Sequence, residues 1–264
     1  MITLIKKELK SSYKIFFIFI GVISLYSSVI VAMYDPTLGE SLHMMAEAMP
    51  QLFAAFGMSD PGVTLLDFLT NYLYGFILIV FPLIFSIIMC HRLMCRYIDK
   101  GSMAYLLSTP YNRFSILLSQ YIVLVIGIVL LIVYATVLVL ICSRVIVHES
   151  LDIMNFLMVN VGLLCLHLFL GTMCYLCACS FNEVKYSLGI GAGLSIAFIL
   201  IQMLSQVSDK IEFLKYLTPL TLFDPKALAS FDSMAMIHIV ILLLCAIIMF
   251  IIASLIFNRR DLSL

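Results

Sequence analysis

Strongly polar side chains are few in the long apolar runs of this sequence: Asn71 and His238 lie near the ends of two runs, and three others are its first candidates for chemistry. These three are His167, Asn160 and Gln202. A polar group in apolar surroundings is costly unless it is hydrogen-bonded, so it serves either a bond between helices or a polar path. Both interpretations stay open for these residues: an interhelical hydrogen bond, or contact with a transported substrate.

Motifs for catalysis, nucleotide binding or metal binding are missing from the sequence. It contains no G-x-x-x-x-G-K-[ST] loop for phosphates and no H-E-x-x-H pair for zinc. Cys174, Cys177 and Cys179 have the spacing C-x-x-C-x-C, but they lie in an apolar run without a second ligand cluster. This favours packing over a metal or redox site. We therefore expect no catalytic residue, no metal, no cofactor bound by the chain itself and no nucleic-acid partner.

The composition places the chain in a lipid bilayer. Of its 264 residues, 64% are hydrophobic and 11% are charged, and the mean hydropathy is +1.16. Soluble domains are about 45–50% apolar and about 25% charged. Apolar runs of about 20 residues can cross the hydrocarbon as helices. The sequence predicts a one-domain, all-α polytopic protein with six transmembrane helices, at about 15–33, 71–94, 115–142, 153–178, 185–207 and 233–257.

The charged residues predict the orientation. Six spans place both termini on one side, and all but four of the fifteen Lys and Arg residues fall on that side. All but four of the fifteen Asp and Glu residues fall on the other side. Because loops rich in Lys and Arg stay in the cytoplasm, we expect both termini there, in a multi-pass protein of the cell membrane.

Amphipathic segments are expected outside the spans. Residues 1–14 carry apolar side chains at helical spacing on one face and lysines on the other, which is typical of an elbow helix along the cytoplasmic leaflet. The external loops 34–70 and 208–232 contain apolar clusters that are too short to span the membrane. We expect short amphipathic helices in both loops, one of them beginning at Pro50.

The fifth predicted span carries small residues four positions apart on two neighbouring stripes. One stripe contains Gly189 and Gly193, and the other contains Ser187, Gly191 and Ser195. Small residues let membrane helices approach closely. We interpret Gly189 and Gly193 as a helix-packing site, whose partner is either another span or a second subunit.

The predicted cytoplasmic connection at residues 95–114 has the features of a docking element. Thr109 is a good N-cap and Pro110 a good first helical residue, so we expect a new helix to start there. Leu106 and Leu107 give the preceding piece an apolar edge, and polar side chains flank it. A loop that is merely tolerated has no need of capped helical geometry, whereas a docking element does.

This connection resembles the first cytoplasmic loop of the type-2 ATP-binding-cassette (ABC) exporter permeases, with its layout acidic-x-Gly-[Ser/Thr]…Leu-Leu-Ser-x-Pro…Arg. The matching residues are Asp99, Gly101, Ser102, Leu106, Leu107, Ser108, Pro110 and Arg113. The N-terminal segment and the basic end "FNRRDLSL" are also similar to that family, so the resemblance covers the whole chain. One departure is that the family often has several consecutive Glu before the Gly, whereas this chain has only Asp99.

The resemblance implies a non-catalytic permease subunit that docks on a separate cytoplasmic ABC ATPase and pairs with a second permease subunit, identical or related. Residues 98–113 would form the coupling helix. Asp99 and Arg113 would supply polar contacts to the ATPase or hold the shape of the loop, and Leu106 and Leu107 would anchor it beneath the bundle. ATP and Mg²⁺ would be bound by the partner ATPase.

The substrate expected from the resemblance is an amphipathic or hydrophobic peptide, as in the phenol-soluble-modulin exporters; drugs, lipids and sodium are alternatives. A secondary transporter driven by an ion gradient is the alternative of another class, and it predicts a buried acid or base near mid-membrane. No Asp, Glu, Lys or Arg lies near the middle of any predicted span. A membrane-embedded enzyme and a non-transporting sensor or scaffold are further alternatives.

Overall fold

Helices make up the described part of this chain. The computed structural model describes residues 1–34, 44, 45, 47–56, 64–99, 101, 103, 111–147, 151–181, 183–207 and 209–259. Within these residues no strand occurs, and six helices are long and apolar enough to cross a membrane. The predicted all-α polytopic fold is confirmed, and the chain is a multi-pass membrane protein.

Each predicted span corresponds to one helix or to a row of consecutive helices. The first is α1 (Ile2–Met33), and the second joins α4 (Leu65–Tyr72), η2 (Leu73–Ile77), α5 (Leu78–Cys90), η3 (His91–Cys95) and α6 (Arg96–Asp99). The third joins α8 (Arg113–Cys142) and η4 (Ser143–Val147), and the last three are α9 (Ile153–Ser180), α10 (Val184–Ser205) and α12 (Ser233–Arg259). The short helices are α3 (Pro50–Ala55), η5 (Asp209–Leu217), η6 (Pro219–Leu222) and α11 (Pro225–Ala229). As predicted, a short helix begins at Pro50.

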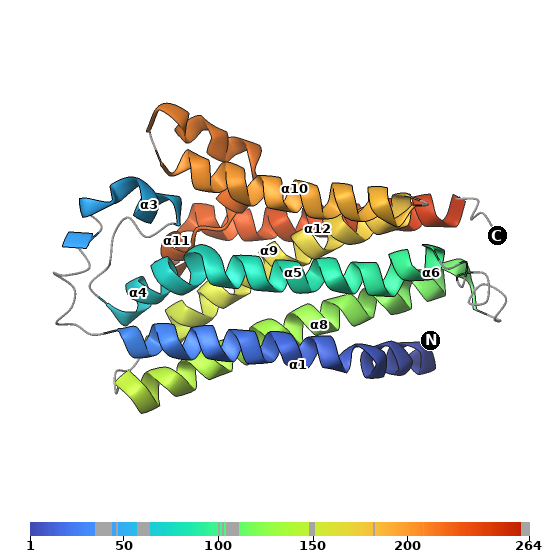
Figure 1. Cartoon of the computed structure of the whole chain (residues 1–264), viewed down its shortest axis with the longest axis horizontal. Helices are drawn as coiled ribbons and strands as arrows, with labels where there is room; N and C mark the ends of the chain where they lie inside the picture. Colours follow the sequence, from blue (N-terminus) through green and yellow to red (C-terminus); the bar gives the residue numbers. More distant parts are fainter. Residues whose placement is uncertain are drawn as a thin grey trace.

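The helices run between two ends of the bundle. The N-terminus, α6 and the last turns of α12 lie at one end, which we call the termini end (Figure 1). α3, α4 and α11 lie at the other, which we call the opposite end (Figure 1). An even number of crossings returns a chain to the side on which it started. The N-terminus and the end of α12 lie at the same end of the bundle, as six crossings require (Figure 1).

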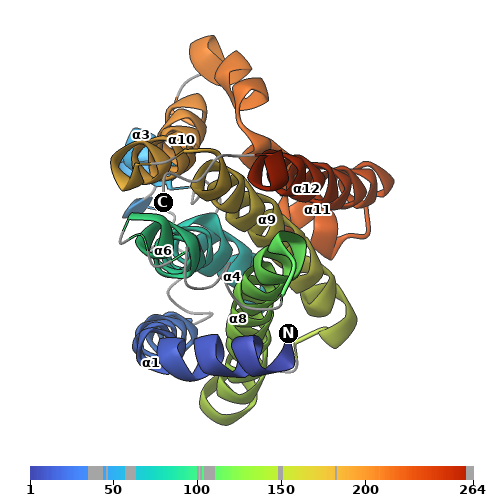
Figure 2. The ribbon, with the colours of Figure 1, turned by 90° about the vertical axis from the view of Figure 1, so that its right-hand side faces the viewer.

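The first turns of α1 turn aside from its main axis and lie across the termini end of the bundle (Figure 2). The helix is nevertheless continuous from Ile2 to Met33, so the predicted elbow at 1–14 is a bent part of the first span and not a separate helix. Serine pairs are one cause of helix bends, and Ser11 and Ser12 lie in this stretch. The Arg92 guanidinium donates to the Ser11 carbonyl oxygen and so competes with the bond of that carbonyl within the helix.

α9 runs through the centre of the bundle, with α8, α10 and α12 around it (Figure 2). Glycines let the neighbouring helices come close to it. A Cβ atom at Gly162 would stand 2.4 Å from Cδ1 of Leu228 in α11, and one at Gly171 would stand 2.8 Å from Cδ1 of Ile128 in α8. The Leu228 and Ile128 side chains would have to shift to admit a larger residue, so these two glycines give room for the side chains of α11 and α8 against α9.

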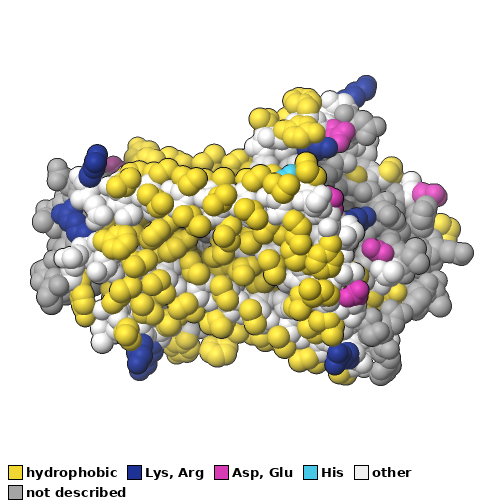
Figure 3. All heavy atoms as spheres, turned by 180° about the vertical axis from the view of Figure 1, so that it is seen from behind, with side chains coloured by type: hydrophobic (Ala, Val, Ile, Leu, Met, Phe, Trp, Pro, Cys, Tyr) yellow, Lys and Arg dark blue, Asp and Glu magenta, His cyan; other side chains and the backbone are white. Residues whose placement is uncertain are grey.

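An apolar band covers the middle of the surface, and charged side chains gather at its two ends (Figure 3). At the termini end the coloured charges are mainly Lys and Arg, whereas at the opposite end Asp and Glu stand together with Lys and Arg (Figure 3). Large apolar side chains in the band are half exposed, among them Leu130, Val133 and Leu200. A band of this width needs lipid to cover it.

Candidate functional site

A hydrogen bond between two spans accounts for His167. Pro82 lies inside α5 and has no N–H, so the carbonyl oxygen of Leu78, four residues earlier, lacks its usual helical donor. The His167 Nε2 atom lies 2.7 Å from this oxygen and donates to it, because a carbonyl oxygen only accepts. His167 is 0% exposed. The sequence left two interpretations open for His167, and this geometry favours the interhelical hydrogen bond over contact with a substrate.

Asn160 joins three spans through its side-chain amide. Its Oδ1 atom accepts from the Tyr74 hydroxyl at 2.9 Å and from the Thr136 hydroxyl at 2.8 Å. Its Nδ2 atom donates to the Phe156 carbonyl at 2.8 Å. Tyr74 belongs to the second span and Thr136 to the third. A satisfied buried amide of this kind holds helices in register, and Asn160 has that role here.

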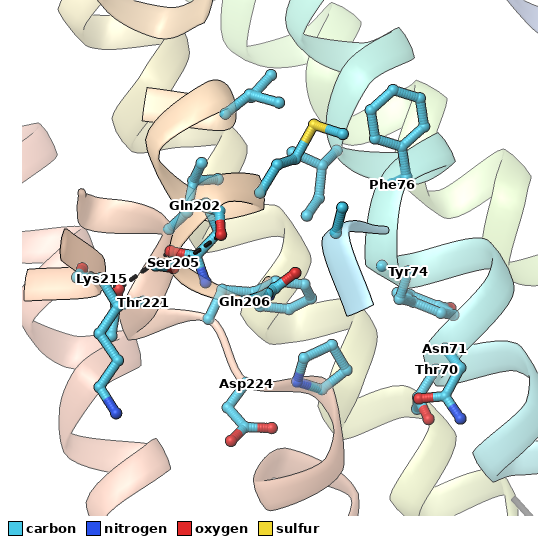
Figure 4. Close-up of a pocket in the computed structure, with 18 of the residues that line it drawn as sticks. Thr70, Asn71, Tyr74, Phe76, Gln202, Ser205, Gln206, Lys215, Thr221 and Asp224 are labelled. Carbon is cyan, nitrogen blue, oxygen red and sulfur yellow. Dashed lines mark hydrogen bonds between the residues drawn. The ribbon is translucent and has the colours of Figure 1, made fainter. Parts of the chain in front are cut away.

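A cavity of about 530 Å³ lies at the opposite end, and Gln202 is in its wall (Figure 4). The second span and α10 form two walls, and η5, η6, α11 and α3 complete the lining. The lining residues are Ala55, Thr70, Asn71, Tyr74, Gly75, Phe76, Ile79, Ile199, Gln202, Met203, Ser205, Gln206, Glu212, Lys215, Leu220, Thr221, Phe223, Asp224, Pro225 and Lys226. Ligand sites are clefts of this size with apolar walls and a few polar groups. Of the three polar candidates from the sequence, Gln202 alone lines it.

A π-helix forms the wall that the second span contributes. η2 is one π turn, and it places Tyr74, Gly75 and Phe76 in the lining. Such turns are rare and occur often at functional sites. The bond from Tyr74 to Asn160 fixes the position of this wall. The sequence pointed to this region only through Asn71 at the start of the predicted span, because nothing in residue spacing marks a π turn.

The wall formed by η5 and η6 is held by a short chain of polar contacts. The Thr221 hydroxyl lies between the Lys215 carbonyl oxygen and Gln202 Oε1, 3.2 Å from the latter. The Lys215 amine forms an ion pair with Glu212 at 2.6 Å, and this bond raises the pKa of Lys215. The Asp224 carboxylate caps α11 by accepting from two backbone N–H groups. Sequence reasoning named none of these contacts, since they arise from the way η5 folds back on α10.

The predicted coupling residues are described only in part. Asp99 ends α6, Gly101 has a φ of +63°, which favours glycine, and Arg113 begins α8. Ser102, Leu106, Leu107 and Pro110 lie outside the described residues. Because Asn112 is extended, the helix predicted to start at Pro110 does not run on into the third span, which begins at Arg113.

The first turns of α1 contact both flanks of this connection. On the flank that leaves the second span, the Tyr97 hydroxyl donates to the Glu8 carboxylate at 2.6 Å, and Glu8 is buried. On the flank that enters the third span, hydrogen bonds from Thr3 and the N-terminal amine lower the pKa of the Tyr111 phenol. We call the contacts on the flank of the second span the N-terminal clamp, which consists of Glu8 with Tyr97 and Ser11 with Arg92.

The two small-residue stripes on α10 have different surroundings. The stripe with Gly191 packs on α9, where a Cβ atom at Gly191 would lie 3.4 Å from Cβ of Cys177 and 3.5 Å from Cα of Cys174. Gly189 and Gly193 are exposed, and a Cβ atom at either would meet no described atom within 4 Å. The Gly189 and Gly193 stripe therefore packs on no other described span.

The cysteine run on α9 packs against α10. Cys174 Sγ lies 3.5 Å from Ser195 Oγ, and the nearby Cys95 Sγ lies 3.1 Å from Ser187 Oγ. All eight cysteines are free thiols. Among the described residues, no three His, Cys, Asp or Glu side chains are grouped so as to hold a metal ion.

These features define a class: an all-α, multi-pass membrane protein with a cavity between its second and fifth spans at one end of the bundle. The chain belongs to the family described as "Protein of unknown function (DUF2705)", whose profile matches residues 28–263. A comparison with curated proteins gives no match. The matched range contains every residue that lines the cavity, whereas the first turns of α1 lie before it.

Proposed function

We propose that this chain is the membrane-spanning subunit of an ATP-driven ABC exporter in the cell membrane, with both termini in the cytoplasm. It moves an amphipathic or hydrophobic substrate, best a peptide, out of the cytoplasm. A separate ATPase subunit binds ATP and Mg²⁺, and a second permease subunit completes the transporter. The chain itself catalyses no reaction.

The N-terminal clamp is the observation that carries this proposal. An ATPase that displaces the connection at 98–113 has to pass the displacement to the spans. The connection joins the second and third spans, and its flank at Arg92 and Tyr97 is held by the first turns of α1. A push on the connection therefore acts on three spans together. Because unpairing the buried Glu8 carboxylate is costly, the contact at Tyr97 resists separation.

The charge distribution supports the orientation. At the termini end the coloured charges are mainly Lys and Arg, whereas the opposite end carries most of the acids together with some Lys and Arg (Figure 3). The positive-inside rule then favours a cytoplasmic termini end. In this orientation Asp99 and Arg113 stand where the connection leaves and re-enters the bundle, within reach of a cytoplasmic partner.

Purification from the native membrane, followed by a transport assay, tests the proposal. We expect an ATPase with a phosphate-binding loop to co-purify with the chain. Arg113→Glu should weaken that association and abolish ATP-driven transport without changing thermal unfolding of the bundle. Arg144→Glu is the matched control, because it reverses an exposed charge at the opposite end and should change neither.

Transport that continues with no ATPase subunit present would overturn the exporter proposal. If that transport collapsed when an ion gradient was removed, the chain would be a secondary transporter. If the purified chain carried no substrate with any ATPase or gradient, the sensor or scaffold alternative would replace both.

A further inference from the structure

The cavity at the opposite end combines apolar walls with amide side chains at its centre. Phe76 and Phe223 line it from the second span and from the segment after η6. Gln202 lies in the last turn of α10 and Gln206 directly follows that helix as its C-cap residue. The Gln206 side-chain amide points toward the middle of the cavity (Figure 4). The Glu212 side chain is 55% exposed, so the cavity communicates with the molecular surface.

The charged side chains of the lining are already engaged within the protein. Lys215 and Glu212 pair with each other, and Asp224 caps α11. Lys226 also makes an interaction within the chain. A ligand held here by its charge would first have to displace one of these contacts. The lining therefore does not favour an inorganic cation or an anionic lipid headgroup over a neutral group.

Most of the uncharged polar groups are engaged as well. The Tyr74 hydroxyl bonds to Asn160, Thr70 bonds to a backbone carbonyl, and Asn71 has an interaction within the chain. Within the part of the chain that the structure describes, the side-chain amide of Gln206 and the side-chain amide nitrogen of Gln202 make no hydrogen bond. A side-chain amide offers one carbonyl acceptor and two N–H donors, which match the C=O and N–H groups of a peptide backbone.

We infer that this cavity binds a short segment of peptide that is uncharged where it is held. Apolar side chains of the peptide lie against Phe76 and Phe223, and its backbone amides bond to Gln202 and Gln206. The π turn gives this site a wall that is fixed before the ligand arrives, since Tyr74 is held by Asn160. Only the place of this step in export rests on the proposed function; the binding itself needs no ATPase.

Binding to the purified full-length chain in lipid nanodiscs, without any ATPase, tests the inference. The probe is a fluorescent peptide of leucine, alanine and glutamine with blocked ends. The comparison peptide has the same sequence with N-methylated backbone amides. We expect saturable binding of the first peptide, weakened about fivefold by N-methylation and by Gln206→Leu. N-methylation should cause little further loss in the Gln206→Leu variant, because the same bond is already gone.

Leu204→Ala is the matched control, since Leu204 lies on the same helix, is 52% exposed and does not line the cavity. Gln206 is exposed, so its replacement should leave folding intact, and thermal unfolding of each variant checks this. Equal binding of the two peptides, or unchanged binding by Gln206→Leu, would overturn the inference. So would saturable binding of tetraphenylphosphonium or sodium in place of the peptide. Loss of ATPase association leaves this assay unaffected, so its failure and the failure of the exporter proposal are separate results.

Discussion

α9 and α10 are neighbours along the chain and in the bundle, yet they use their polar side chains differently. Among the described spans α9 is the most covered and α10 the least, with 56% and 17% of their most apolar windows buried. His167 and Asn160 on α9 bond to neighbouring spans, whereas Gln202 and Gln206 on α10 face a cavity. A polar residue in a membrane helix thus serves packing where protein surrounds the helix, and is available to a ligand where a cavity adjoins it.

The largest effect is expected where α10 packs on α9. Gly191→Leu forces a side chain into a contact only 3.4 Å from Cys177, and should lower the free energy of unfolding by about 3 kcal/mol. Gly193→Leu, two residues on, points away from α9 and should change it by less than about 0.5 kcal/mol. Unfolding in detergent, followed by circular dichroism, measures both. Similar losses for the two variants would erase the distinction between the stripes.

A smaller effect is expected at the bond from α9 to the second span. His167→Leu leaves the Leu78 carbonyl unpaired next to Pro82, and should cost about 2 kcal/mol of stability. In a Pro82→Ala background the N–H of residue 82 can donate to the Leu78 carbonyl oxygen. His167→Leu should then cost less than half as much stability. An equal cost in both backgrounds would show that His167 does not compensate for the proline.

A third prediction concerns the bond from the cavity wall to α9. Tyr74→Phe removes one of the two hydroxyls that bond to Asn160 Oδ1, and should cost about 1 kcal/mol because the Thr136 bond remains. It should also weaken peptide binding slightly, since the ring is held less firmly. Tyr216→Phe is the control, because Tyr216 is 78% exposed. A loss with Tyr216→Phe equal to that with Tyr74→Phe would contradict the role of this bond.

The smallest effect is expected at the ion pair on η5. The pKa of Lys215 is raised above its ordinary value of 10.5 by the hydrogen bond that its amine donates to the Glu212 carboxylate. A raised lysine pKa stabilises the fold at pH values below 10.5, and this contribution is lost as pH rises through the higher value in the folded state. Glu212→Gln should therefore lower the lysine pKa measured by NMR on the labelled side chain, with little change in melting near neutral pH. An unchanged pKa would show that the pair does not persist in solution.

The spans could be predicted from sequence because each depends on a local property, the length of an apolar run. The last three predicted spans differ from the observed helices by at most two residues at either end. The second and third spans extend four to six residues beyond the prediction at one or both ends. The first differs most, since its helix runs on through residues 1–14 and only bends there. Hydropathy reports where a helix enters lipid, not where helical hydrogen bonding begins.

The cavity could not be predicted in the same way, because its walls are far apart in sequence. Gln202 and Asn71 were visible as amides near span ends, but Thr221 reaches Gln202 only after η5 folds back. Pro82 in a helix predicts that the carbonyl oxygen four residues earlier lacks its helical donor, yet no spacing rule identifies His167 as the donor that replaces it. Local sequence patterns predict the helices, whereas the pairing of distant polar groups depends on how those helices pack.

The N-terminal clamp has a consequence for the order in which the chain is made. Glu8 and Ser11 leave the ribosome early, but their partners Tyr97 and Arg92 follow 89 and 81 residues later. Until the second span has been inserted, the Glu8 carboxylate has no such donor and must stay at the wet surface of the bilayer. The contacts at the bend of α1 therefore form only after the second span has been made, and they precede the contact of Ser24 with Tyr134 in the third span. Their formation reports that the second span has crossed the membrane in the correct direction.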